Sequence, residues 1–185
     1  MTAHRFNLLA LGMISYLVVF FASRFHGVRY LLGAQIDFLP GLVVVAALMH
    51  GMSAVLVVAI TGGLLFDSIS ANPLGVTTFS LCVVGAVVYF NRDLLLKDQF
   101  YPQFVLGASA SAGAPILSYI VVSIMGWRPL VDWQSLWVLL IMTVTGGLAT
   151  PVWFVIFQRV DRALHYQTIP ESSFRADREI ERGRT

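Results

Sequence analysis

The stretch TGGLLFDSISANPLG, residues 61–75, decides how the chain is folded at its centre. An apolar run closes on one carboxylate, Asp67, and a second apolar run opens at Asn72 and Pro73. Two apolar runs around a short polar turn predict two consecutive helices. Asn72 is expected to cap the second helix and Pro73 to begin it, which are common preferences at a helix start.

The composition of the whole chain places these helices in a membrane. Of its 185 residues, 57% are hydrophobic and 12% are charged, and the mean hydropathy is +0.78. These values are far from those of a soluble domain. A spanning helix needs roughly 20 apolar residues, so a chain of this length holds about six spans. The sequence therefore predicts an all-α integral membrane protein with little room for a soluble catalytic domain.

Six apolar segments are expected to form one transmembrane helical bundle within residues 1–165. They are residues 6–23, about 31–49, 52–67, 73–90, 103–125 and 135–157. In an alternative with five helices, residues 38–66 form one long helix interrupted only by His50 and Gly51. At 1.5 Å per residue that helix would exceed the bilayer core, which favours a turn at MHGM. The distribution of Lys and Arg slightly favours five helices instead.

The two ends of the chain carry different signals. The N-terminal run has the basic start of a secretory signal peptide, but it is long enough to span and is interpreted as an uncleaved helix. Half of the 12 basic residues follow the last apolar run: Arg159, Arg162, Arg175, Arg178, Arg182 and Arg184. This excess predicts a cytoplasmic C-terminus. Residues 166–185 are expected to be a polar, disordered tail.

Two acidic residues in the apolar part of the chain are candidate site residues. Asp67 either ends its helix and faces the positive end of the next one, or holds a partner or ligand at the membrane boundary. Asp37 is the N-cap of a helix that begins at Phe38, or it lies within a span that begins near residue 31 and needs a polar neighbour. Pro40 favours the cap, because proline is common at helix starts.

Small residues are concentrated in GASASAGAP, residues 107–115, and in two TGGL runs at 61–64 and 145–148. Such residues let helices approach closely in lipid, where no hydrophobic drive holds helices together. The positions expected to pack helices are Gly62, Gly63, Gly107, Gly113, Pro115, Gly146 and Gly147. Uncharged polar residues of the last two segments, including Ser111, Ser118 and Thr150, are expected to form interhelical hydrogen bonds rather than a ligand pocket.

The sequence lacks the patterns of a catalytic or metal site. Its four histidines are scattered, Cys82 is its single cysteine, and it contains neither a Walker loop nor a GxGxxG motif. An intramembrane enzyme would need several ionisable groups that face one cavity. We therefore expect no enzyme activity, no cofactor and no metal. A lipid-modifying enzyme would require two of Asp37, Asp67 and His50 to converge.

The ordered set QIDFLPGLVVVAAL, then GGLLFDSISANPLGVTTFSLCVVGAVVYFNRDLL and a small-residue helix resembles the MreD family of bacterial rod-shape-determining membrane proteins. The resemblance covers roughly residues 30–130. The positions that match the family pattern are Asp37, Gly63, Leu64, Leu65, Asp67, Pro73, Leu74, Gly75 and Arg92. In one departure, Ile36 rather than a proline precedes Asp37, and the proline follows as Pro40.

The resemblance implies a non-catalytic scaffold of the cell-elongation complex in the bacterial cytoplasmic (inner) membrane. Its partner would be the bitopic protein MreC, and through it MreB filaments, the peptidoglycan synthase RodA and its transpeptidase partner. Membrane lipids would surround it and nucleic acid would not bind. Whether the chain forms a homo-oligomer is left open. Asp67, Asn72, Pro73, Gly75 and Asp37 are the residues expected to contact the partner or to form the turn.

A second function remains open at this point. The helical arrangement also looks like the substrate-binding S component of energy-coupling factor vitamin transporters. This likeness implies a membrane subunit that binds a small molecule and docks on an ATPase pair. Such a subunit needs convergent polar groups in one cavity.

Overall fold

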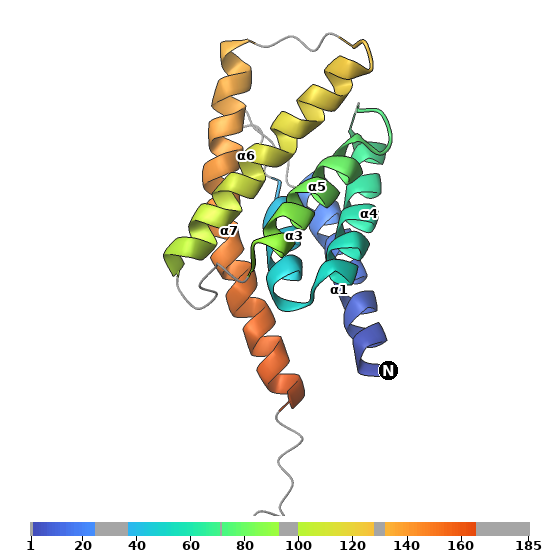
Figure 1. Ribbon diagram of the computed structural model, residues 1–185, viewed down its shortest axis with the longest axis vertical. Helices are drawn as coiled ribbons and strands as arrows, with labels where there is room; N and C mark the ends of the chain where they lie inside the picture. The colour runs from blue at the N-terminus through green and yellow to red at the C-terminus, as the bar shows by residue number, and fades with distance from the viewer. Residues whose placement is uncertain (1, 25–36, 71, 93–99, 128–131, 166–185) are drawn as a thin grey trace, which may run out of the picture.

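The computed structural model describes residues 2–24, 37–70, 72–92, 100–127 and 132–165. Within these ranges it is all-helical, which confirms the expected class (Figure 1). The expected tail, residues 166–185, lies outside the described residues, as do residues 31–36 at the start of the second expected segment. The helices are α1 (Thr2–Arg24), α3 (Leu39–Met49), α4 (Met52–Ile69), α5 (Val76–Phe90), α6 (Phe100–Ile124) and α7 (Trp133–His165).

The turn expected at MHGM is present, so the single long helix of the five-helix alternative is wrong. α3 ends at Met49, and Gly51 occupies the N-cap position of α4 with a φ of 88°. Glycine adopts such a φ readily, whereas residues with a Cβ rarely do. Gly51 therefore lets the chain reverse within two residues, and α3 and α4 form a hairpin.

α3 lies at the centre of the bundle (Figure 1). Its residues from Leu39 to Leu48 are all buried, and the helix contacts α1, α4, α5, α6 and α7. A helix that is apolar on all sides is typical of an element surrounded by other helices. With 11 residues it is about 16 Å long, which is shorter than the roughly 30 Å hydrocarbon core. α3 thus forms the core of the bundle and is too short to cross a bilayer alone.

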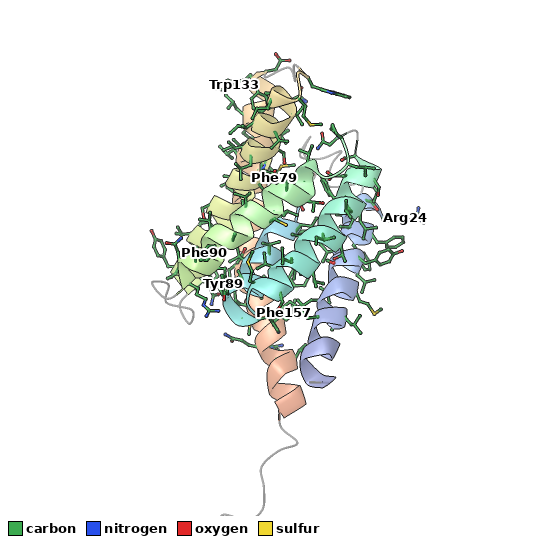
Figure 2. All side chains as sticks on the ribbon, turned by 45° about the vertical axis from the view of Figure 1, so that its right-hand side comes forward. Arg24, Phe79, Tyr89, Phe90, Trp133 and Phe157 are labelled. Atoms are coloured by element: carbon green, nitrogen blue, oxygen red, sulfur yellow. The ribbon has the colours of Figure 1, made fainter. Side chains whose placement is uncertain are left out.

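Three helices are long and apolar enough to cross a membrane, namely α4, α6 and α7. The apolar helices Leu8–Arg24, α3 and α5 are shorter. Large apolar side chains such as Phe79, Phe90 and Trp133 are exposed on the outside of the bundle (Figure 2). Lipid would cover such a surface. The length and the surface of these helices are those of a membrane protein.

α6 and α7 pack side by side as a long hairpin. Its upper end, towards Ile124 and Trp133, extends beyond the end of α4 and the start of α5 (Figure 1). The overhanging part of this hairpin faces the turn between α4 and α5. This arrangement places residues of α3, α4, α5, α6 and α7 around one space, which is described below.

The glycines expected to pack helices lie at close helix contacts, with one exception. A Cβ added to Gly63 on α4 would lie 2.6 Å from the Cα of Thr78 on α5, and one added to Gly62 would lie 2.6 Å from Cδ2 of Leu39. At Gly113 the nearest atom is a methyl carbon of Val84 at 3.7 Å, an ordinary contact. Between α6 and α7, added Cβ atoms would meet the following side chains: Thr150 at Gly107, Ser111 at Gly146, and Phe104 at Gly147.

Gly63→Ala is expected to destabilise the fold, because the new Cβ would meet backbone atoms of Thr78 and could be relieved only by moving α4 away from α5. We expect a loss of about 1–3 kcal/mol, as for other overpacked sites. Gly113→Ala is the matched control and should be neutral or stabilising by about 0.5–1 kcal/mol, since alanine favours the helix. Thermal unfolding of both variants in detergent measures the difference. Equal stabilities would contradict the tight α4–α5 contact.

Candidate functional site

The carboxylate of Asp67 connects the end of α4 to the start of α5. Its side chain is 2% exposed. Oδ2 accepts a hydrogen bond from the N–H of Gly75 at 2.8 Å, and the N–H of Thr77 donates to both carboxylate oxygens at 3.2 Å. The first N–H groups of a helix have no partner within the helix. Asp67 therefore caps α5 from the preceding helix, with its charge at the positive end of the helix dipole.

This geometry confirms that Asp67 faces the next helix and corrects the expected helix start. α5 begins at Val76, three residues after Pro73, and its N-cap is Gly75 with a φ of 96° and no side-chain cap hydrogen bond. Asn72 is exposed and does not cap the helix. The physical reason is that Asp67 already occupies the N–H groups that a local cap would bind. Gly75 adopts the positive φ that this turn needs, which residues with a Cβ rarely do.

The turn between α4 and α5 has a buried support and an exposed surface. Asp67 is the support and is too deeply buried to contact a partner directly. Asn72 is exposed, and Leu74 at 73% exposure is one of the most exposed apolar residues described. An exposed leucine beside a tightly held turn is available to lipid or to another protein. Any partner contact at this turn would thus involve Asn72 and Leu74, with Asp67 acting through the shape of the turn.

Asp37 lies just before α3, at the opposite side of the bundle core from His50. Its Oδ1 accepts a hydrogen bond from the N–H of Leu39 at 2.9 Å. The helix begins at Leu39 rather than at Phe38, and Phe38 occupies the N-cap position without a side-chain cap. Asp37 was expected at the N-cap position. It lies instead one residue before that position, and its side chain still caps the helix. No donor among the described residues contacts its second oxygen, Oδ2.

The electrostatics of Asp37 differ from those of an ordinary surface aspartate. Asp37 precedes the first residue of α3 and lies outside the helices. Burial raises the pKa of its carboxyl group from 3.8 to about 6, although the hydrogen bond from the Leu39 N–H lowers it. Desolvation disfavours the charged carboxylate because the surroundings solvate it less well than water. At neutral pH this group is therefore ionised at a cost in free energy.

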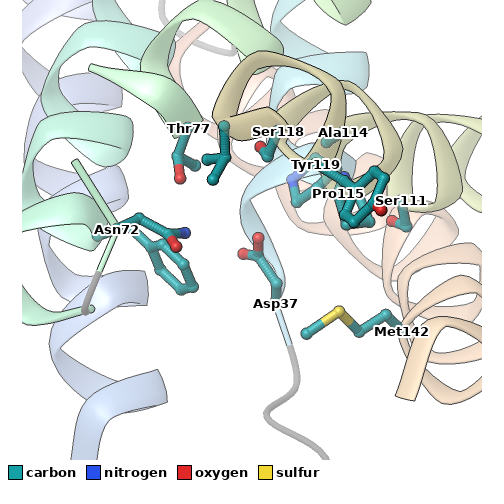
Figure 3. A pocket seen from close by; sticks show the side chains of 12 residues that line it. Asp37, Asn72, Thr77, Ser111, Ala114, Pro115, Ser118, Tyr119 and Met142 are labelled. Carbon is teal, nitrogen blue, oxygen red and sulfur yellow. The ribbon is translucent and has the colours of Figure 1, made fainter. Parts of the chain in front are cut away.

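Asp37 lines a pocket of about 270 Å³ between the start of α3, the α4–α5 turn and the α6–α7 hairpin, which we call the Asp37 pocket. Figure 3 shows its carboxylate between Asn72 on one side and Tyr119 and Met142 on the other. The other polar residues that line the pocket are Asn72, Thr77, Ser111, Ser118 and Tyr119. Its apolar residues are Pro40, Phe66, Ala114, Pro115, Val122 and Met142.

Only some of the polar side chains around the pocket have a hydrogen-bond partner. Ser118 donates to Ser80 on α5 at 3.0 Å, so the expected interhelical hydrogen bond exists there. The Ser111 hydroxyl is buried and has no partner within the described structure. Pro115, four residues later, has no N–H to donate to the Ser111 carbonyl. The expectation was wrong for Ser111, and also for Thr150, whose hydroxyl donates to Gly146 of its own helix at 2.8 Å.

Of the residues considered for catalysis, His50 converges with neither Asp37 nor Asp67. His50 follows the last residue of α3, whereas Asp37 precedes the first, so the length of the helix separates them. His50 and Asp67 are likewise at opposite ends of α4. In the part of the chain that the structure describes, no group of three or more His, Cys, Asp or Glu residues could hold a metal ion.

No protein-family model, curated protein or solved structure matches this chain. The functional argument therefore depends on the geometry of the α4–α5 turn and of the Asp37 pocket. These two sites share a wall, because Asn72 and Thr77 belong both to the turn region and to the pocket lining.

Replacement of Asp67 by alanine should destabilise the protein. The N–H groups of Gly75 and Thr77 would lose their charged acceptor in a buried place. We expect a loss of about 2–3 kcal/mol of stability, whereas Asn72→Ala on the same turn should change it by no more than about 0.5 kcal/mol. Thermal unfolding in detergent compares the two. Similar small effects would show that the carboxylate is not needed to cap α5.

Replacement of Asp37 by asparagine should stabilise the protein at neutral pH only. The pKa of Asp37 is higher in the folded than in the unfolded chain, so folding favours the protonated carboxyl group. The contribution of the protonated Asp37 carboxyl group to stability is fully present below pH 3.8 and is lost as the pH rises through about 6. Asparagine stays neutral and can still accept the Leu39 N–H.

The variant should therefore unfold about 2–4 °C above the wild type at pH 7.5 and at the same temperature as the wild type at pH 4. Unfolding curves of both proteins across this pH range measure the difference. A difference that does not depend on pH would contradict the raised pKa of Asp37.

Proposed function

We propose that this chain is a non-catalytic scaffold of the bacterial cell-elongation complex, similar to MreD, in the cytoplasmic membrane with its C-terminus inside the cell. In this proposal the helices cross the membrane as one bundle and the chain binds a bitopic partner of the MreC type. Through that partner it would act with MreB filaments and with RodA and its transpeptidase.

One observation carries this proposal, namely the construction of the α4–α5 turn. The most specific part of the family pattern falls on Asp67, Pro73, Leu74 and Gly75. A carboxylate that is 2% exposed holds this turn, and Leu74 projects from it with 73% exposure. Fixing an exposed apolar residue in one position lowers the entropic cost of binding. The turn is therefore well suited to be a partner contact at the membrane surface.

Further support comes from the outer faces of the helices. α1 and α7 expose large apolar side chains along their length, for example Phe20 and Phe21 on α1 and Val152 on α7. In a bilayer these faces meet either lipid or another helix, and helices associate there by van der Waals packing. A bitopic partner offers one such helix.

Depletion of the protein in its native bacterium, combined with pull-down of a tagged copy, tests the proposal. We expect rods to become round and an MreC-like protein to be recovered. Within the pull-down, Leu74→Gln should reduce recovery about tenfold, equivalent to about 1.4 kcal/mol of binding free energy. Leu56→Gln is the control, because Leu56 is 40% exposed but lies near the end of α4 that is opposite the turn. Normal rods, or equal recovery with both variants, would contradict the proposal or the role of the turn.

The Asp37 pocket favours a second candidate function. Convergent polar groups in one cavity are what an S-component-like subunit for a small molecule requires, and six polar residues line this pocket. In that case the pull-down should recover an ATPase pair instead of an MreC-like protein, and depletion should leave the rods unchanged.

A further inference from the structure

We propose that the Asp37 pocket binds a primary ammonium group, carried by a small organic amine or by the ethanolamine headgroup of a membrane lipid. This inference rests on the pocket and not on the scaffold function, so either can fail without the other.

The charge of the pocket selects a cation. Among the described residues that line the pocket, Asp37 is the single acidic one, and its Oδ2 has no donor among the described residues. The side chains that face it are uncharged on every element that lines the pocket: Phe66 on α4, Asn72 in the turn, Thr77 on α5, Ser111, Ser118 and Tyr119 on α6, and Met142 on α7. Tyr119 is the single other titratable group in this lining. A carboxylate in such surroundings is costly unless a cation pairs with it.

The hydrogen-bonding groups favour a primary ammonium over a metal ion or a quaternary amine. An ammonium group has three N–H donors and no acceptor. Oδ2 of Asp37 can take one of them, and the side-chain oxygens of Asn72 and Thr77, which also line the pocket, can take others. A quaternary amine has no N–H for these acceptors. A metal ion would need more charged or oxygen ligands than one carboxylate and a few hydroxyl groups supply.

The size and the apolar walls restrict the remainder of the ligand. The volume of about 270 Å³ is just below the usual range for small-molecule sites, about 300–1,000 Å³. The ligand is therefore small, or only its headgroup enters. Phe66 and Tyr119 supply aromatic rings, and aromatic rings attract organic cations through their π faces.

The place of the pocket explains why a lipid headgroup is one of the two sources. The pocket lies where α4 ends and α5 begins, beside the overhanging α6–α7 hairpin (Figures 1 and 3). Helix ends and connecting turns of a membrane bundle lie near the headgroup layer. A cation held there can come from the aqueous side or from a neighbouring lipid.

The first arm of the test uses the purified full-length protein in detergent. Thermal unfolding is measured with 2-phenylethylamine and with the neutral 2-phenylethanol, at pH 7.5. We expect the amine to raise the unfolding temperature by several degrees in a concentration-dependent manner and the alcohol to have no effect. Asp37→Asn should remove the amine effect, and Asp132→Asn, which removes an exposed carboxylate outside the pocket, should retain it. The comparison of amine with alcohol needs no variant.

The second arm identifies the source of the ammonium group. The protein is extracted from nanodiscs that contain equal amounts of phosphatidylethanolamine, phosphatidylcholine and phosphatidylglycerol, and its bound lipid is measured by native mass spectrometry. Enrichment of phosphatidylethanolamine by about tenfold, lost in Asp37→Asn, assigns the site to the lipid headgroup. An effect of 2-phenylethylamine without lipid enrichment assigns it to a free amine. If neither arm distinguishes the ammonium compound from its neutral or quaternary comparators, or if Asp37→Asn behaves as wild type, the proposal is overturned.

Discussion

The fold depends on the hydrogen bonds that the Asp67 carboxylate accepts from the start of α5. The N–H of Thr77 is buried and that of Gly75 is partly buried, and an N–H left unsatisfied in such a place costs free energy. By capping α5 from the end of α4, Asp67 fixes the angle at which the two helices meet. Gly63 then lies directly against the backbone of Thr78. The turn held in this way also forms one wall of the Asp37 pocket through Asn72 and Thr77.

The sequence alone predicts the helices well, because the length of an apolar run and the position of glycine are local properties. Each expected segment corresponds to one helix, and Gly51 marks the break between α3 and α4. The start of α5 was not predictable from local preferences. Its cap, Asp67, is eight residues from Gly75 and ten from Thr77, whereas capping rules consider only neighbouring residues.

The pocket shows a second limit of what the sequence alone predicts. Its residues on α6 are Ser111, Ala114, Pro115, Ser118, Tyr119 and Val122, and this spacing of three and four residues places them on one helix face. That stripe is visible in the sequence and could have indicated a shared surface. The opposite walls come from the start of α3 and from the α4–α5 turn, and only tertiary packing brings them to face the stripe. The role of Asp37 was open for the same reason.

The central position of α3 has a consequence for how the protein is made. α3 is apolar on every side, and its contacts include α6 and α7, which the ribosome synthesises later. A helix of about 16 Å is too short to cross a bilayer by itself, so in a membrane α3 would have to insert together with α4, its hairpin partner. Its far side stays uncovered until the last two helices arrive. The core is therefore completed only after α6 and α7 have been synthesised, and until then the nascent chain exposes a face that the folded protein buries.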